Sequence, residues 1–277
     1  MILSYLRTLT RPGFVIPVFF LICFTASGQP AWQESSVSAA GGSFSSRHGI
    51  ADVRYNQAGL GWTNQHTISL QHAQPFMISD LTVASLAVQV PVKNGGLGAA
   101  FSSYGIRGFR QTSLWISCGM KLHPAVSAGL GLHFLNTGVS ERVLFHAAIS
   151  CALGIQVKLN EDLCLSGHVM HPVAWSDLDP GLDNRKMMIA AGISYTFFES
   201  ATYYSDLHLF PQGYLQWCHG IEICAVKQLM IILGTHNRPW SVSGGITLKY
   251  HHWSVNLATE YCFDTGTTPS SAITYAW

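Results

Sequence analysis

The sequence predicts an all-β protein, a transmembrane antiparallel β-barrel of about 14 strands with an N-terminal lumenal plug segment. Three observations lead to this prediction. The 277-residue chain is 48% hydrophobic but only 10% charged, whereas soluble domains carry about 25% charged residues. The N-terminus has the layout of an export signal. Much of the remaining chain alternates between apolar and polar residues, and no later stretch supplies the roughly 20 charge-free apolar residues of a spanning helix.

Residues 1–28 are predicted to be a cleaved signal peptide. Arg7 and Arg11 form a basic region, residues 14–24 are apolar, and residues 26–28 are small, which is the order that secretory signals follow. The alternative is a membrane-anchor helix, but the apolar stretch is short and a proline interrupts it. Because lipid tolerates only helices and closed barrels, an exported chain without spanning helices is expected in the outer membrane of a Gram-negative bacterium.

Residues 29–63 precede the first predicted strand and are rich in glycine and serine. One interpretation is a flexible lead-in. The other, which we favour, is a plug or hatch segment folded into the lumen, because a barrel this wide needs something to fill or gate it. The predicted organisation is therefore signal peptide 1–28, plug segment 29–63 and transmembrane barrel 64–277.

The predicted strands are segments of about ten residues that alternate between an apolar and a polar face. In the segment 251–261, for example, Trp253 and Leu257 share one parity, whereas Ser254 and Asn256 share the other. The predicted strands cover residues 64–73, 81–91, 96–105, 110–122, 125–136, 142–158, 162–171, 186–197, 201–209, 213–225, 228–236, 240–250, 251–261 and 268–277.

The last predicted strand ends in an outward aromatic pattern. Ile273, Tyr275 and Trp277 lie two residues apart, and Trp277 is the final residue. An ordinary edge strand could end in this way, but after a signal peptide and alternating strands the pattern favours a C-terminal barrel-assembly signal.

The connectors fit a barrel with short periplasmic turns at 93–96, 123–124 and 160–162. The longest predicted connector, 172–185, is expected on the outer side. It contains Asp177, Asp179 and Asp183. These carboxylates could hold Ca²⁺, but the loop lacks the spacing of an EF-hand, which favours a solvated acidic loop.

One short stretch carries a family resemblance. Asn56, Ala58, Gly59 and Leu60 resemble the Asn-Pro-Ala-Gly-Leu hallmark of FadL-type outer-membrane barrels. Gln57, which stands where that hallmark has proline, is similar to the PorV/PorQ-like branch of the group. Independently of any kinship, asparagine can bond turn backbone, and glycine permits positive φ or close approach to the wall.

The resemblance extends to residues 192–195 and 220–222, which are similar to strand segments of that branch. It implies a fourteen-stranded barrel with an N-terminal plug. It also implies either transport of hydrophobic ligands or service in an outer-membrane protein-secretion machine. The glutamine at position 57 weakens any transfer of the transporters' gating mechanism.

Other chemistry is poorly supported. Six cysteines follow the signal; Cys118 and Cys151 are expected to face lipid, and the remaining four to point inward, either as small apolar residues or with one disulfide involving Cys218. The 13 histidines show no metal-ligand spacing: His251 and His252 are adjacent and would point to opposite faces of a strand. No metal and no cofactor is expected.

The sequence leaves three function classes open. The favoured hypothesis is a non-enzymatic accessory subunit of an outer-membrane secretion or assembly complex, because the loops are short. The alternative is a FadL-like channel for small hydrophobic molecules. A barrel enzyme is disfavoured, because no G-x-S-x-G motif occurs. Expected partners are outer-membrane lipids, other outer-membrane or periplasmic proteins and, for the channel, a hydrophobic ligand. With a net charge of +1, no nucleic acid is expected.

Overall fold

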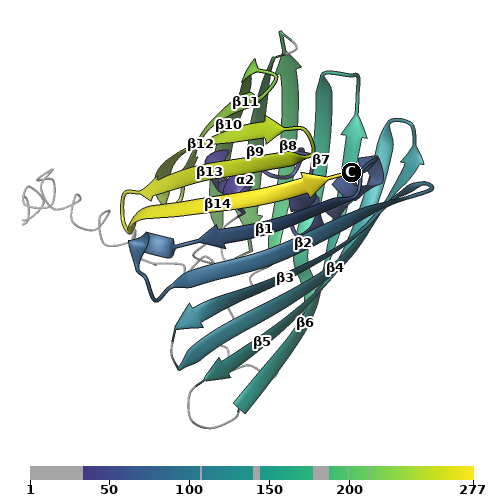
Figure 1. The fold of residues 1–277 in the computed structure, drawn as a ribbon. Coiled ribbons are helices and arrows are strands. Elements are labelled where there is room, and N and C mark those ends of the chain that lie inside the picture. The colour runs from purple at the N-terminus through teal and green to yellow at the C-terminus, as the bar shows by residue number, and fades with distance from the viewer. Residues whose placement is uncertain (1–33, 107, 140–143, 177–186, 199, 212) are drawn as a thin grey trace, which may run out of the picture. The chain divides into compact units, whose positions relative to one another are not determined.

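In the computed structural model, the predicted barrel is confirmed. The structure describes residues 34–106, 108–139, 144–176, 187–198, 200–211 and 213–277. These residues all belong to one compact unit, Trp32–Trp277. Fourteen antiparallel strands pair in sequence order, and β1 pairs with β14, so that the sheet closes (Figure 1). No helix among the described residues is long and apolar enough to cross a membrane.

The element bounds agree closely with the alternation of the sequence. The helices are α2 (Ser35–Ala39) and the 3₁₀ helices η1 (Ile50–Val53), η2 (Gln57–Trp62) and η3 (Pro75–Met77). The strands are β1 (Thr67–Ala73), β2 (Thr82–Val92), β3 (Gly95–Ile106), β4 (Phe109–His123), β5 (Val126–Val139), β6 (Leu144–Lys158), β7 (Leu163–Ser176), β8 (Met188–Phe197), β9 (Ala201–Phe210), β10 (Tyr214–Val226), β11 (Leu229–Asn237), β12 (Trp240–Tyr250), β13 (Trp253–Cys262) and β14 (Gly266–Ala276).

Alternation along each strand separates an inward from an outward face. In β1, the residues of one parity are buried and those of the other are exposed. Leu70, on the outward face, is 60% exposed, whereas the neighbouring Ser69 is 1% exposed. The same alternation leaves a large apolar residue exposed on the outer face of most strands, which is the arrangement of barrels that face lipid.

We call the end where β1 begins and β14 ends the proximal end, and the opposite end the distal end. The proximal turns include residues 93–94 and 124–125, and the distal connectors include 211–213 and 238–239. The predicted turns 93–96, 123–124 and 160–162 therefore all lie at the proximal end.

Several predicted boundaries differ from the structure by one to five residues, and three of the differences have identifiable features. The first strand begins at Thr67 rather than residue 64, because residues 57–62 form η2. His251 and His252 lie in the turn between β12 and β13, not in a strand, and His251 has φ 51°. The predicted connector 172–185 begins too early, since β7 continues to Ser176.

Pro172 explains the last error. The ladder between β6 and β7 passes from the pair Ala152–Met170 directly to Ser150–Ala174, so β7 bulges at the proline. Because proline has no N–H to donate, sheets accommodate it at such irregularities. Asp177, Asp179 and Asp183, considered above for Ca²⁺, lie outside the described residues.

Candidate functional site

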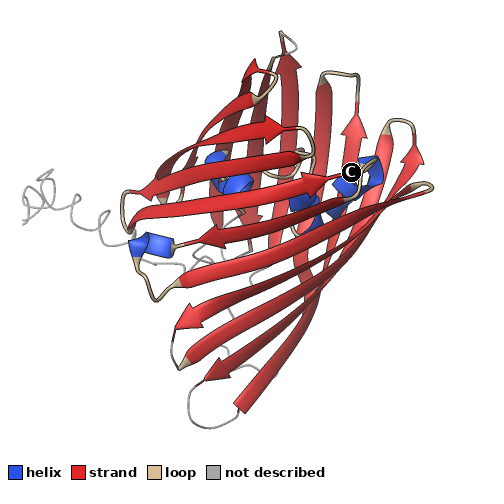
Figure 2. Cartoon of the chain, viewed as in Figure 1, coloured by secondary structure: helices blue, strands red, loops and turns tan. Residues whose placement is uncertain are grey.

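Residues 34–62, here called the lumenal segment, lie against the inner face of the wall. Helix α2 contacts β11, β12 and β13, whereas η2 contacts β3 to β6. Figure 2 shows these helices, in blue, within the ring of strands. Most of their side chains are buried. The segment therefore lies inside the lumen of the barrel.

The motif residue Asn56 holds two parts of the lumenal segment together. Its Nδ2 donates to the backbone oxygen of Ser45 over 2.6 Å. Its Oδ1 accepts from the N–H of Ala58 over 3.2 Å, and the oxygen of Ala58 accepts from Ser127 Oγ of β5 over 2.7 Å. Asn56 is completely buried. The predicted role of this asparagine in bonding the backbone of a turn matches its contacts.

The other motif residues, Gln57, Leu60 and Gly59, each make a different kind of contact. Gln57 is fully buried, and its Nε2 donates to the oxygen of Arg54 over 3.2 Å. Leu60 belongs to a buried apolar cluster with Val53 and Trp115. Gly59 corrects the prediction, because its φ is not positive and its missing side chain faces the carboxyl group of Asp52 inside the segment, not the wall. A Cβ there would lie 2.2 Å from Asp52 Oδ2.

Glycines on the inner face of the strands allow the lumenal segment to lie directly against the wall. A Cβ on Gly119 or Gly129 would lie within 2.3 Å of the backbone of Gln57, and one on Gly154 would lie 2.0 Å from Asn56 Oδ1. Real Cβ atoms do not approach so closely, so only glycine permits the contact. Sequence analysis missed this set, although isolated glycines inside strands often mark close backbone approach. Further wall glycines against the segment are Gly98, Gly131, Gly220, Gly234 and Gly245.

Asp206, on β9, anchors the turn of the segment. Its Oδ2 accepts from the N–H groups of Phe44 and Ser45, each over 2.8 Å, and from Ser45 Oγ over 2.6 Å. The carboxyl is 2% exposed, and His208 Nε2 lies 3.6 Å from it. Hydrogen bonds to a charged group are stronger than neutral ones. Sequence analysis did not single out Asp206, although a carboxylate on the inward parity of a strand is an available signal.

A second connection is ionic. Arg47 pairs with Glu222 of β10 over 2.8 Å and also donates to the backbone oxygen of Ser36.

Within the segment, burial raises the pKa of Asp52 well above its ordinary value, and the nearby Glu34 raises it further. Burial also raises the pKa of Glu34. The segment thus contains two buried acids whose pKa values are raised by burial.

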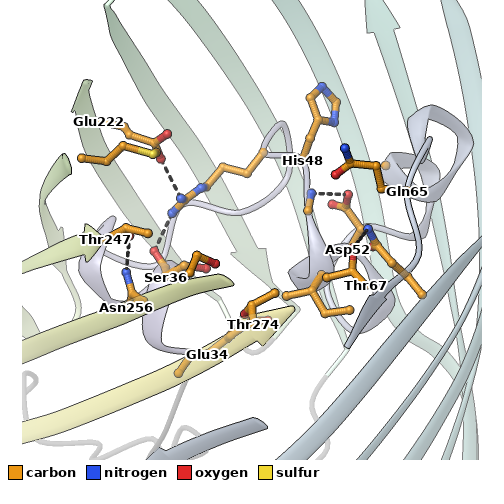
Figure 3. A pocket seen from close by; sticks show the side chains of 18 of the residues that line it. Glu34, Ser36, His48, Asp52, Gln65, Thr67, Glu222, Thr247, Asn256 and Thr274 are labelled. Atoms are coloured by element: carbon orange, nitrogen blue, oxygen red, sulfur yellow. Dashed lines mark hydrogen bonds and ion pairs between the residues drawn. The ribbon is translucent and has the colours of Figure 1, made fainter. Parts of the chain in front are cut away.

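An open part of the lumen remains beside the segment. A cavity of about 460 Å³ is lined by the segment, by residues 63–65 and by strands β1, β2 and β9 to β14. Its lining is mixed, with Glu34, His48 and Asp52 from the segment and Asn256 and Thr274 from the wall (Figure 3). This volume lies within the ~300–1,000 Å³ range of small-molecule sites.

A cluster of apolar side chains lies in the distal half of the lumen. Phe44 of the segment packs with Met188 and Phe210 in a buried cluster, and Tyr55 and Tyr214 lie against it. The rings of Phe44 and Tyr55 lie 4.9 Å apart, and those of Phe210 and Tyr214 lie 4.3 Å apart. We call this set the apolar cluster. These side chains form an apolar patch within a mostly polar lumen, and the rings of His168 and His208 lie beside Phe44.

The predicted C-terminal signal lies on the outer face at the proximal end. Ile273 is 49% exposed and Trp277 is 53% exposed. The ring of Tyr275 lies 5.5 Å from that of Trp277 and 4.7 Å from that of Trp253. Aromatic groups in this position are typical of the membrane interface.

The cysteines give no disulfide among the described residues. All six described thiols are free; Cys118 is exposed and Cys151 partly exposed, whereas Cys164, Cys218 and Cys262 are buried. Cys224 has the inward parity of Cys218 but is exposed near its strand end. Within the described part of the chain, no three His, Cys, Asp or Glu side chains gather as metal ligands.

Comparison with known proteins gives a likeness of structure. No protein-family model and no curated sequence matches the chain. The toluene transporter TodX of Pseudomonas putida matches with a TM-score of 0.67 at 11% identity, covering 88% of this chain and 97% of its own. The toluene transporter TbuX of Ralstonia pickettii has a TM-score of 0.60 at 12% identity, with 91% and 98% covered.

A FadL homologue of Pseudomonas aeruginosa is also similar, with a TM-score of 0.57 at 11% identity, covering 88% of this chain and 97% of its own. At these identities the likeness establishes the architecture. The chain therefore has the fold of FadL-type channels.

Proposed function

We propose that this protein is an outer-membrane channel through which small hydrophobic molecules enter. The observation that carries the proposal is the apolar cluster, in which Phe44, Met188 and Phe210 are buried inside the lumen near its distal end. Apolar solutes partition into such surroundings, whereas ions and sugars pay a desolvation cost there. The TodX and TbuX structures, which share the fold, are those of toluene transporters.

In this proposal residues 29–63 are the plug. The proximal end faces the periplasm, because the short turns of bacterial barrels lie on the periplasmic side. A solute would enter at the distal end, displace Phe44 from the apolar cluster and reach the 460 Å³ cavity. The hydrogen bonds of Asn56 and Asp206 hold the plug in place meanwhile.

The findings support this channel better than the accessory subunit favoured from the sequence. The similar structures named above are transporters or a FadL homologue. The apolar cluster also fits passage of a solute through the lumen, which an accessory subunit would not require. The similarity of Gln57 to the PorV/PorQ-like branch remains a prediction from the sequence. Stoichiometric co-purification of other envelope proteins in mild detergent would revive the accessory role.

Uptake of a hydrophobic dye tests the channel. In a Gram-negative host, N-phenyl-1-naphthylamine is excluded by the outer membrane and fluoresces once inside. Cells with the wild-type protein should take up the dye faster than cells without it. Ala190 is a buried residue of β8 that also belongs to this cluster, so Ala190→Gln, which places a polar side chain there, should return uptake to background. Uptake of a sugar should not change in either strain. Equal uptake with and without the protein would refute the proposal.

A further inference from the structure

A thiol and an imidazole lie side by side on the inner face of the wall, near the distal end of the barrel. Cys218 Sγ of β10 lies 3.6 Å from Nδ1 of His208 on β9. Both side chains are buried, with 1% and 3% of their surface exposed. The strand register explains the contact, because Cys218 is opposite Asp206 and His208 follows two residues later with the same inward parity. Neither Cys218 nor His208 belongs to the apolar cluster.

Asp206 orients the imidazole from its other ring nitrogen. Asp206 Oδ2 lies 3.6 Å from His208 Nε2, and the N–H groups of Phe44 and Ser45 hold the same oxygen in place. A carboxylate at one ring nitrogen of a histidine fixes the tautomer, so that the other nitrogen presents its lone pair to a metal ion. In His208 that other nitrogen is Nδ1, which faces Cys218.

An amide oxygen faces the same nitrogen. Gln216 Oε1 lies 3.4 Å from His208 Nδ1, and the amide is oriented because Gln216 Nε2 donates to the backbone oxygen of Arg238 over 2.9 Å. With Nε2 protonated towards Asp206, Nδ1 and Oε1 are both acceptors and cannot bond to each other. A cation beside Nδ1 would be attracted to both atoms and would relieve this unfavourable pairing.

The number and kind of ligands select the cation. Zn²⁺ sites use three or four protein ligands, and Ca²⁺ and Mg²⁺ prefer oxygen. Among the residues that the structure describes, no three His, Cys, Asp or Glu side chains gather as metal ligands, which disfavours these ions. Thiolate selects soft ions such as Cu(I), and imidazole also suits copper. One thiolate and one imidazole nitrogen are sufficient for Cu(I), because this ion forms linear complexes with two ligands.

We propose that Cys218 and His208 form a binding site for a single Cu(I) ion in the wall of the lumen. The ion would lie between Sγ and Nδ1 and take the place of the thiol proton, which is released. Metal–sulfur and metal–nitrogen bonds of about 2.3 and 2.0 Å span slightly more than the observed 3.6 Å, so a small rotation of the side chains admits the ion. Thiolate and Cu(I) cancel in charge, so binding adds no isolated charge to this buried place.

Competition for Cu(I) tests the site on the purified full-length barrel. Under reducing, oxygen-free conditions, the wild-type protein should withdraw one equivalent of Cu(I) from its coloured complex with bicinchoninate. Cys218→Ser and His208→Gln should each weaken this binding by about tenfold or more, because loss of even a group that orients a ligand costs about 10–100-fold in metal affinity. Cys164→Ser is the matched control, since Cys164 is also buried but bonds backbone, and it should bind as the wild type does. Heat-modifiable gel migration checks that each variant is folded.

A second measurement needs no variant. X-ray absorption of the wild-type barrel loaded with one equivalent of Cu(I) should show one sulfur and one imidazole nitrogen as neighbours of the metal. Two sulfur neighbours, or no nitrogen, overturns the proposal, as does equal affinity in Cys218→Ser and the wild type. Stoichiometric binding of Zn²⁺ that is lost in Cys218→Ser also overturns it, because it would require more than two ligands at this place. Dye uptake is measured without copper, so this site and the channel are tested separately.

Discussion

At the scale of single residues, the contacts of Asn56 could be predicted from the sequence and those of Gly59 could not. Asn56 bonds turn backbone, as its chemistry suggested. Gly59 was expected to need positive φ or contact with the wall, yet it is small because the Asp52 carboxyl occupies the space beside it. No local pattern could reveal this contact, because it arises only when η1 folds against η2.

A double substitution tests this reading of Gly59. Gly59→Val should loosen the lumenal segment, since its Cβ would lie 2.2 Å from the Asp52 carboxyl. Asp52→Ala empties that space, so Gly59→Val combined with Asp52→Ala should recover part of the loss. The measurement is maleimide labelling of Ala58→Cys in a background without native cysteines. Equal labelling in the single and double variants would show that Gly59 is needed for another reason.

The buried Asp52 also predicts a pH dependence. Its pKa in the folded protein is raised, chiefly by burial. A raised acid pKa means that the contribution to stability is fully present below the ordinary value of about 3.9 and is lost as pH rises through the folded pKa. The segment should therefore be held most tightly at low pH and should loosen as pH increases.

Asp52→Asn should remove this dependence, because the amide cannot ionise and can still accept the bond from Gly49, 2.9 Å long in the native chain. Labelling of Ala58→Cys should be followed from acid to neutral pH, each rate divided by that of a free thiol. The ratio should rise with pH in the native background and stay flat with Asp52→Asn. A parallel rise in both proteins would assign the dependence to other groups, such as Glu34.

At the scale of elements, the strands were largely predictable because a barrel wall enforces a two-residue period on every strand. The exceptions have local causes. The bulge at Pro172 follows from its missing N–H, and His171 before it takes φ 55°. The fit of the lumenal segment was not predictable in the same way, because it depends on glycines from several strands that meet only after the barrel closes.

These wall glycines can be tested against Gly138, a strand glycine of outward parity that does not face the lumenal segment. A Cβ on Gly154 would lie 2.0 Å from Asn56 Oδ1, whereas one on Gly138 would meet nothing closer than 3.9 Å. Gly154→Ala should displace η2 and increase labelling of Ala58→Cys several-fold, because the polar contacts of Asn56 are expensive to break when buried. Gly138→Ala should label as the parent does. Both variants should insert into the membrane, and similar labelling of the two would contradict a wall-to-segment fit.

At the scale of the whole molecule, composition and the signal-like N-terminus sufficed to predict the architecture. A chain so poor in charge must cover much of its surface with something other than water. The structure accordingly exposes apolar side chains outward and buries polar ones inward. The apolar cluster that supports the proposed channel could not be predicted in this way, because it combines Phe44 with residues of β8 and β9, far away in sequence.

Closure of the barrel makes the C-terminus a test of the whole architecture. Strand β14 pairs with both β13 and β1, so it is the element that closes the sheet. Its last residues pair Tyr275 with Ile68 and Ala276 with Thr67, and Trp277 exchanges two backbone bonds of 3.0 Å with His66. Deleting residues 275–277 leaves the start of β1 without these partners, and unpaired backbone groups are costly in lipid.

The truncated protein should therefore fail to insert and should be degraded before it reaches the membrane. Fractionation and heat-modifiable migration measure this directly. Trp277→Phe keeps the backbone bonds and an aromatic ring, so it should insert normally, which separates closure from the chemistry of the indole. If the truncated chain accumulates in the outer membrane at the native level, the remaining pairs of β1 and β14 are sufficient, and the final three residues are not an assembly signal.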